Sequence, residues 1–235
     1  NLMKKKLDNI KKILESYPLT YQVIKYIYRL IRIDYKIYKY RRKKVRENCY
    51  LRYENGERLI KKSYGNISLV YEAVSAKNFW HLSTGNQNEE RFLNKFLETH
   101  VHDGMTIFDI GGHTGQYTIP LAKKVGPNGK VYVFEPDEIG QTAIKNNCKI
   151  NNISNVKLLK LAVTDKNEKV KFYIRPDKDT HSIFKETSSP SPTGKQICLE
   201  VDSMCLDSLI ENQIIENKPD LVKIDTEGAE IKILR

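Results

Sequence analysis

The residues that could do chemistry gather at positions 106–117, which read TIFDIGGHTGQY. A short apolar run, 106–110, carries a carboxylate at Asp109. Three glycines follow the run directly: Gly111, Gly112 and Gly115. Glycines allow positive φ angles and let a backbone approach a ligand closely. If 116–124 forms a helix, the free amides at its start favour a negatively charged group. The order of strand, glycine turn and helix therefore predicts a ligand-binding turn.

An acid further along completes this pattern. The valine- and aromatic-rich run 130–134 reads as a second strand, and Glu135 follows it, 20 residues after Gly115. In nucleotide-binding folds, an acid at the tip of the second strand holds the ribose diol. The spacing D-x-G-G-x-x-G differs from the G-x-G-x-x-G of nicotinamide-binding proteins. A glycine turn alone is weak evidence, but its combination with Glu135 predicts a nucleoside-type cofactor.

The elements that must position these residues alternate along the chain. Strands are expected at 67–71, 106–110, 130–134, 156–163, 168–174, 197–201 and 220–224, and helices at 88–99, 116–124, 137–150, 205–211 and from 228. Asn55-Gly56 suggests a hairpin turn between 50–53 and 58–60, and 175–195 reads as a surface loop. The βαβαβ order predicts an α/β fold with a doubly wound parallel sheet, whose ligand lies outside the carboxyl ends of the strands.

The basic character of the chain belongs to its N-terminal part. Residues 1–62 hold 19 Lys and Arg against 6 Asp and Glu, whereas residues 63–235 hold 21 against 23. Helices are expected at 1–17 and 19–40. In the second helix, cations recur at helical spacing: Lys25, Arg29, Arg32, Lys36 and Lys39. Beside them run Ile24, Tyr28, Ile31, Tyr35 and Tyr38.

Three interpretations of this arm stay open. Residues 19–44 could lie on an anionic membrane surface, with tyrosines at headgroup depth. They could grip a nucleic-acid backbone, which we favour least. They could also pack on the following domain and leave a solvated cationic face.

Composition bounds the cellular setting. No apolar run approaches the length of a membrane span, and no signal peptide is visible. The four cysteines show no CxxC spacing, which argues against a zinc site or a disulfide framework. We expect a cytoplasmic protein, placed peripherally at the inner membrane surface if the arm binds lipid.

Residues from about 90 to 235 resemble the FkbM-type family of class I methyltransferases, which use S-adenosylmethionine (SAM). The matching stretches are FDIGGHTGQYT at 108–118, VYVFEPD at 131–137, NNCKINN at 146–152, LKLAVTD at 159–165, CLDSL at 205–209 and LVKIDTEGAE at 221–230. The family more often has alanine and asparagine at positions 112 and 113. The resemblance implies a Rossmann-like core of seven strands, so we expect this sheet to be truncated after its fourth core strand. We expect a helical N-terminal region at 1–75 and a methyltransferase domain at 76–235.

The resemblance also implies roles for individual residues. The amides of Gly111, Gly112 and Gly115 would meet the methionine portion of SAM, and Asp109 would orient the turn or contact the cofactor's ammonium through water. Glu135 would accept both ribose hydroxyls. Ala162, Val163 and Asp165 would lie against the adenine.

Asp225 and Glu227 follow the strand at 220–224, and the resemblance places them beside the transferred methyl group. They could orient an acceptor hydroxyl or take its proton. Alternatively, Asp225 caps a helix and Glu227 is a first-turn acid. Methyl transfer is an in-line displacement that depends largely on positioning, and it requires no metal.

The expected function is SAM-dependent O-methylation of a sugar, a glycolipid or a small metabolite. The alternative is a methyltransferase for RNA or another nucleic acid that uses the basic arm. Against it, residues 225–228 read DTEG and not the D/N-P-P-Y/F of base amino-group methylases. A third hypothesis, a nicotinamide-binding module without catalysis, is opposed by the glycine spacing.

Overall fold

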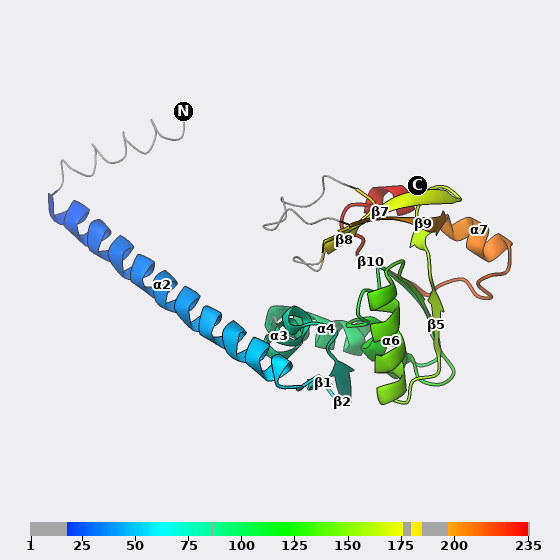
Figure 1. The fold of residues 1–235 in the computed structure, drawn as a ribbon, viewed down its shortest axis with the longest axis horizontal. Helices are drawn as coiled ribbons and strands as arrows, with labels where there is room; N and C mark the ends of the chain where they lie inside the picture. Colours follow the sequence, from blue (N-terminus) through cyan, green and yellow to red (C-terminus); the bar gives the residue numbers. More distant parts are fainter. Residues whose placement is uncertain (1–17, 86, 176–179, 185–196, 235) are drawn as a thin grey trace. The chain divides into compact units, whose positions relative to one another are not determined.

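The computed structural model describes residues 18–85, 87–175, 180–184 and 197–234 (Figure 1). The chain divides into two compact units, Asn1–Arg52 and Tyr53–Arg235. Most of one long helix, α2 (Pro18–Glu54), forms the described part of the first unit. The helix predicted at 1–17 lies outside the described residues. None of the described helices is both long and apolar enough to cross a membrane.

The helix predicted at 19–40 is present but continues to Glu54, so the hairpin predicted around Asn55-Gly56 is wrong. Gly56 instead closes the end of the helix. Its amide donates to the carbonyl of Tyr53 at 3.0 Å, and its φ of +93° is one that a glycine adopts without strain.

The second unit alternates strands and helices. Its strands are β1 (Leu59–Tyr64), β2 (Ile67–Glu72), β3 (Thr106–Ile110), β4 (Lys130–Phe134), β5 (Val156–Leu159), β6 (Ala162–Val163), β7 (Glu168–Arg175), β8 (Thr180–Ser182), β9 (Ile197–Met204) and β10 (Leu221–Ile224). Its helices are α3 (Ala76–Thr84), α4 (Gln87–His100), α5 (Thr118–Val125), α6 (Glu138–Ile150), α7 (Leu206–Glu211) and α8 (Glu230–Ile233). The sequence signals for α4, β3, β4 and α6 predicted their bounds to within one residue. The helix α3 and most of β1 were not predicted.

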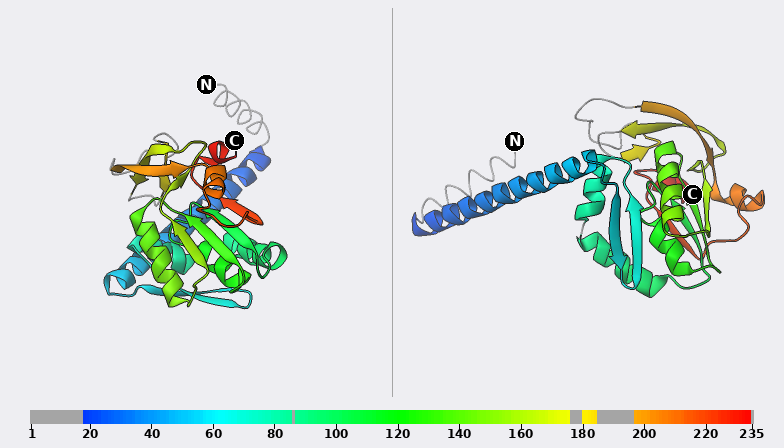
Figure 2. Two further views of the ribbon diagram at one scale, coloured as in Figure 1. Left: turned by 90° about the vertical axis from the view of Figure 1, so that its right-hand side faces the viewer. Right: turned by 60° about the horizontal axis from the view of Figure 1, so that its bottom comes forward.

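The central sheet has four described strands in the order β10-β3-β4-β5, all parallel. Side chains alternate across it, so Phe108, Ile110, Tyr132 and Phe134 form one face. This face packs against Leu209 and Ile215 in a single apolar cluster. The helices α5 and α6 cover the opposite face, and the hairpin β1-β2 packs against both helices (Figures 1 and 2). All five residues of β3 are therefore buried, and the predicted doubly wound sheet is confirmed.

A second sheet, in the order β6-β9-β7-β8, lies across the carboxyl ends of the parallel strands (Figure 2). The single strand predicted at 156–163 is wrong, because it is divided between the two sheets. Residues Val156–Leu159 extend the parallel sheet, whereas Ala162–Val163 pair with β9. The surface loop predicted at 175–195 contains β8, which pairs with β7. The rest of that loop from residue 185 lies outside the described residues.

Candidate functional site

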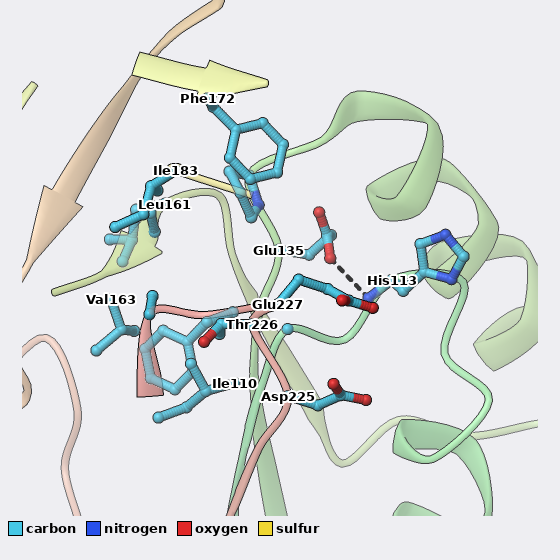
Figure 3. A pocket seen from close by; sticks show the side chains of 15 residues that line it. Ile110, His113, Glu135, Leu161, Val163, Phe172, Ile183, Asp225, Thr226 and Glu227 are labelled. Atoms are coloured by element: carbon cyan, nitrogen blue, oxygen red, sulfur yellow. Dashed lines mark hydrogen bonds between the residues drawn. The ribbon is translucent and has the colours of Figure 1, made fainter. Parts of the chain in front are cut away.

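One pocket opens at the carboxyl edge of the parallel sheet and is roofed by the second sheet (Figure 3). Its lining comes from the ends of β3, β4 and β10, from the segment around β6, and from β7 and the residue after β8. The lining residues are Ile110, Gly111, His113, Phe134, Glu135, Pro136, Leu161, Ala162, Val163, Phe172, Ile183, Asp225, Thr226, Glu227 and Ala229. Figure 3 shows an apolar side, with Leu161, Val163 and Phe172, and an acidic side, with Glu135, Asp225 and Glu227.

The Glu135 carboxylate is the most deeply buried acid of this pocket, with 4% of the residue exposed. One carboxylate oxygen, Oε2, accepts from the His113 amide at 2.6 Å, and the other, Oε1, accepts from the Asp137 amide at 2.8 Å. Burial raises the pKa of Glu135 to about 7, although both hydrogen bonds act to lower it. The carboxylate is thus held in one orientation while it remains poorly solvated.

The glycine turn owes its shape to backbone bonds. The amides of Gly111 and Gly112 both donate to the carbonyl of Phe134, and the amide of Gly115 donates to the carbonyl of Gly112. Gly111 lines the pocket, whereas Gly112 and Gly115 lie behind it. The amides of all three glycines are therefore hydrogen-bonded within the protein. The turn contributes the backbone of Gly111 to the wall of the pocket.

Two of these positions have no room for a side chain. Gly111 has a φ of +81°, and a Cβ there would lie 2.0 Å from the carbonyl oxygen of Asp225. A Cβ on Gly112 would lie 2.2 Å from Cγ2 of Val133. The alanine that is more common in the family at position 112 would therefore require Val133 to shift in this chain.

Asp109 lies beneath the turn and does not line the pocket. Its Oδ1 forms an ion pair with Lys223 Nζ at 2.9 Å, and its Oδ2 accepts from the Thr118 hydroxyl at 2.6 Å. The same Lys223 Nζ donates to the carbonyl of Gly111 at 2.8 Å. Burial is the largest single effect and lowers the pKa of Lys223, but the charge and hydrogen bond of Asp109, together with the charges of Asp225 and Tyr117, outweigh it and the net shift is upward. This ion pair joins β3, β10 and the glycine turn.

Asp225 and Glu227 both line the pocket, and both are exposed. Burial, followed by the charges of Asp225 and Glu230, raises the pKa of Glu227. Glu227 adopts a φ of +53°, which is uncommon for a residue with a side chain. The peptide carbonyl of Glu227 accepts from the Ser182 hydroxyl at 2.8 Å, so the second sheet contacts this loop.

Neither Asp225 nor Glu227 takes the helix-terminal role considered for it. The short helix α8 begins only at Glu230, and its N-cap residue is Ala229, with no side-chain hydrogen bond to the start of the helix. The Glu230 carboxylate accepts from two loop amides, those of Thr226 and Gly228, at 2.9 Å each. Burial acts to raise the pKa of Glu230, but its hydrogen bonds together outweigh burial and the net shift is downward. Glu230 therefore holds the loop that carries the two predicted catalytic acids.

The three residues predicted to contact the adenine separate in the structure. Ala162 and Val163 are buried and line the apolar side of the pocket. Asp165 is exposed and lies outside the lining, because the chain turns away after β6. Sequence reasoning missed Phe172 and Ile183, which complete this side from the second sheet. Phe172 lies in an alternating strand and Ile183 in a stretch that the sequence predicted as a surface loop, so neither gave a sign that it faces a ligand pocket.

Hydrogen bonds from β2 and α6 also support the glycine turn. The Asn147 side chain accepts from the Glu72 amide at 2.8 Å and donates to the carbonyl of Thr114 at 3.1 Å. The Tyr71 hydroxyl donates to the carbonyl of Gln116 at 3.3 Å. Asn151, one helical turn after Asn147, exchanges two hydrogen bonds with the backbone of Val70. The sequence signal that could have predicted this support is the pair Asn147 and Asn151, four residues apart in the NNCKINN stretch.

Residues 109–235 match the model of the methyltransferase FkbM domain. No curated protein matches the chain. Among solved structures, a putative rRNA methylase from Clostridium thermocellum is 24% identical over 34% of this chain and 42% of its own, with a TM-score of 0.31. A SAM-dependent methyltransferase from Aquifex aeolicus is 32% identical over 30% of this chain and 36% of its own, with a TM-score of 0.27.

M. jannaschii TYW2, solved in complex with AdoMet, is 21% identical over 48% of this chain and 53% of its own, with a TM-score of 0.34. The chain thus aligns with roughly half or less of each of these three structures. The family model covers more than half of the chain and includes the glycine turn, Glu135 and the β10 loop. The chain therefore belongs to the FkbM family of SAM-dependent methyltransferases.

Proposed function

We propose that this enzyme methylates a hydroxyl group of a sugar, a glycolipid or a small metabolite, with Asp225 and Glu227 acting on the acceptor. The observation that carries the proposal is the pair of acids at the pocket. Neither caps α8, and the pKa of Glu227 is raised. A carboxylate with a raised pKa is a better proton acceptor near neutral pH than an ordinary surface acid.

The residues present fit the cofactor. Each oxygen of Glu135 accepts one backbone amide, and a carboxylate oxygen has a second lone pair for a further donor. Two ribose hydroxyls would take these remaining acceptor sites. The apolar side around Val163 and Phe172 suits a purine base.

SAM supplies an electrophilic methyl group on a cationic sulfonium. What the chain must do is hold the acceptor oxygen in line with that methyl group and receive its proton. Asp225 and Glu227 are the pocket carboxylates that follow β10 at this edge. Glu230 accepts from amides of the loop that carries them, and Lys223 joins β10 to the glycine turn. Removing a group that transfers a proton typically lowers turnover by about 10²–10⁴-fold.

The test combines binding and turnover. The chain is incubated with SAM and with separate panels of glycosides, glycolipids and RNA, and S-adenosylhomocysteine release is measured. We expect release with a hydroxyl-bearing glycan or metabolite. Asp225→Asn and Glu227→Gln should keep the SAM dissociation constant, measured by calorimetry, and lose turnover by about 10²-fold or more.

Glu211→Gln serves as the matched control, because Glu211 is an exposed acid of α7 outside the pocket. It should leave both quantities unchanged. Parent turnover in both pocket variants would remove Asp225 and Glu227 from the mechanism. Methylation of RNA alone would overturn the proposed acceptor class.

A further inference from the structure

The described part of α2 carries a concentration of positive charge that the methyltransferase reaction does not use. The helix has 37 residues, which makes it about 55 Å long at the α-helical rise. It contains eleven Lys and Arg but only three Asp and Glu, a net charge of +8. From residue 32 to residue 48 every side chain of the helix is exposed.

The cations form a stripe along one face. Arg32, Lys36, Lys39, Lys43 and Arg46 follow one another at alternating spacings of four and three residues. Such spacing keeps side chains on one side of an α-helix. We call these five residues the basic stripe. Arg41, Arg42 and Lys44 add charge around it, and the acid Glu47 pairs with Lys43 at 3.7 Å.

Exposed tyrosines and aliphatic residues surround the basic stripe. At about 100° per residue, Tyr35 and Tyr38 follow one side of it and Tyr40 and Ile33 the other, whereas Ile37 and Val45 lie on the opposite face of the helix. Tyr35, Tyr38 and Tyr40 are between 54 and 59% exposed. Ile33, Ile37 and Val45 are exposed as well, at 44 to 46%. Exposed apolar side chains are common singly, but here six large ones occur within thirteen residues of one helix, and four of them lie to the sides of a continuous stripe of cations.

The tyrosines are also paired with the cations along the helix. Lys39 Nζ lies 4.8 Å from the centre of the Tyr35 ring, and Lys44 Nζ lies 5.2 Å from that of Tyr40. A guanidinium nitrogen of Arg42 donates to the Tyr38 hydroxyl at 3.2 Å. Each pair joins a positive charge to an amphipathic ring one turn away. That combination suits the boundary between lipid headgroups and acyl chains.

We propose that this face of α2 binds the surface of an anionic lipid bilayer. The basic stripe would meet the lipid phosphates, and the three tyrosines with Ile33 on its two sides would enter the headgroup layer. A nucleic-acid backbone would use the cations but would gain little from the exposed isoleucine, so lipid is the better match. The inference does not depend on the methyl acceptor, and its test requires no catalysis.

The test is co-sedimentation of the full chain with vesicles. We expect binding to phosphatidylcholine vesicles that contain phosphatidylglycerol and little binding to phosphatidylcholine alone. One basic residue near an anionic surface changes affinity by about fivefold. The triple variant Lys36→Gln, Lys39→Gln and Lys43→Gln should therefore bind about 100-fold more weakly. Glutamine has a helix propensity close to that of lysine, so α2 should persist, which circular dichroism checks.

The matched control replaces three exposed lysines of the second unit, Lys123, Lys145 and Lys149, with glutamine. It changes the net charge equally and should leave vesicle binding nearly unchanged. A second variant, Tyr35→Ser with Tyr38→Ser, keeps every charge and should lose the binding that survives at high salt. Equal binding by the parent and the triple lysine variant would overturn the proposal. Tighter binding to polyuridylate RNA than to anionic vesicles at the same salt concentration would also overturn it.

Discussion

At the residue scale, Glu135 shows how burial and hydrogen bonding oppose each other. Two backbone amides point at its carboxylate, and such bonds favour the charged form. Burial among Pro136, Phe134 and the start of α6 disfavours that form more strongly, so the pKa rises to about 7. The orientation of the Glu135 carboxylate that would hold a ribose therefore comes with a desolvation penalty on its charged form.

This penalty predicts a pH-dependent stability. Because the folded state has the higher pKa, about 7 against 4.5, it binds the Glu135 proton more tightly than the unfolded state does. The favourable contribution is complete below about pH 4.5 and disappears as the pH rises through about 7. Relative to the Glu135→Gln variant, the parent should lose about 3 kcal/mol of unfolding free energy between pH 4.5 and pH 8. Denaturant unfolding of both proteins across this range measures it.

The glutamine amide cannot accept from both backbone donors, but that defect is the same at every pH and cancels from the difference in slope. Parallel pH profiles for the two proteins would show that Glu135 titrates with an ordinary pKa.

At the element scale, α6 connects the glycine turn to the hairpin β1-β2. Asp137 caps the helix by accepting from the Gly140 amide at 3.1 Å. Two turns further on, Asn147 holds Glu72 of β2 on one side and Thr114 of the turn on the other. The residues of β2 lie outside the matched family segment, yet they support the glycine turn, which lies inside that segment.

The variant Asn147→Ala should lower the unfolding free energy by about 2 kcal/mol, because it leaves a buried carbonyl and an amide without their partner. It should also weaken SAM binding, since Thr114 loses its anchor. The control is Asn146→Ala, one residue away, where the exposed side chain donates to the Glu72 carboxylate at 2.8 Å. Calorimetry and thermal unfolding of both variants provide the measurement. Unchanged SAM affinity in Asn147→Ala would confine this residue to a purely structural role.

At the scale of the whole molecule, the pocket exists only because two sheets meet. The parallel sheet supplies the acids and the glycine turn, and the second sheet supplies Phe172 and Ile183. Ser182 is the polar link between them. It is buried, accepts from the Phe184 amide at 3.1 Å and donates to the carbonyl of Glu227.

Loss of this link should loosen the loop that carries the predicted catalytic acids. A typical net hydrogen bond of about 1 kcal/mol corresponds to about a fivefold change in local opening. In Ser182→Ala, the amides of Thr226 and Gly228 should therefore exchange about fivefold faster with deuterated solvent. The control is Ser208→Ala on α7, which removes a hydroxyl that accepts from the Asn167 side chain. It should leave those two amides unaffected. Identical exchange in the parent and Ser182→Ala would show that the second sheet does not restrain the loop.

Local signals in the sequence determined the central elements of this protein. The apolar run before Asp109, the glycines after it and the strand before Glu135 each predicted a local structure with little dependence on distant residues. Because the carboxyl ends of parallel strands share one edge, these signals also brought Gly111, Glu135, Asp225 and Glu227 to one pocket. Family membership followed from the same stretches.

Tertiary structure decided the features that depend on partners distant in sequence. A strand pattern cannot reveal that Leu159 and Ala162 belong to different sheets, since both are apolar and only pairing with β9 separates them. Lys223 reads as a surface lysine until the register places it opposite Asp109. The start of the last helix was also not evident: Asp225 was a possible cap, but α8 begins only at Glu230, because its first turn is set by contacts and not by spacing. Asp165 turned out to be exposed because the chain leaves the pocket after β6, and no local signal marks that turn.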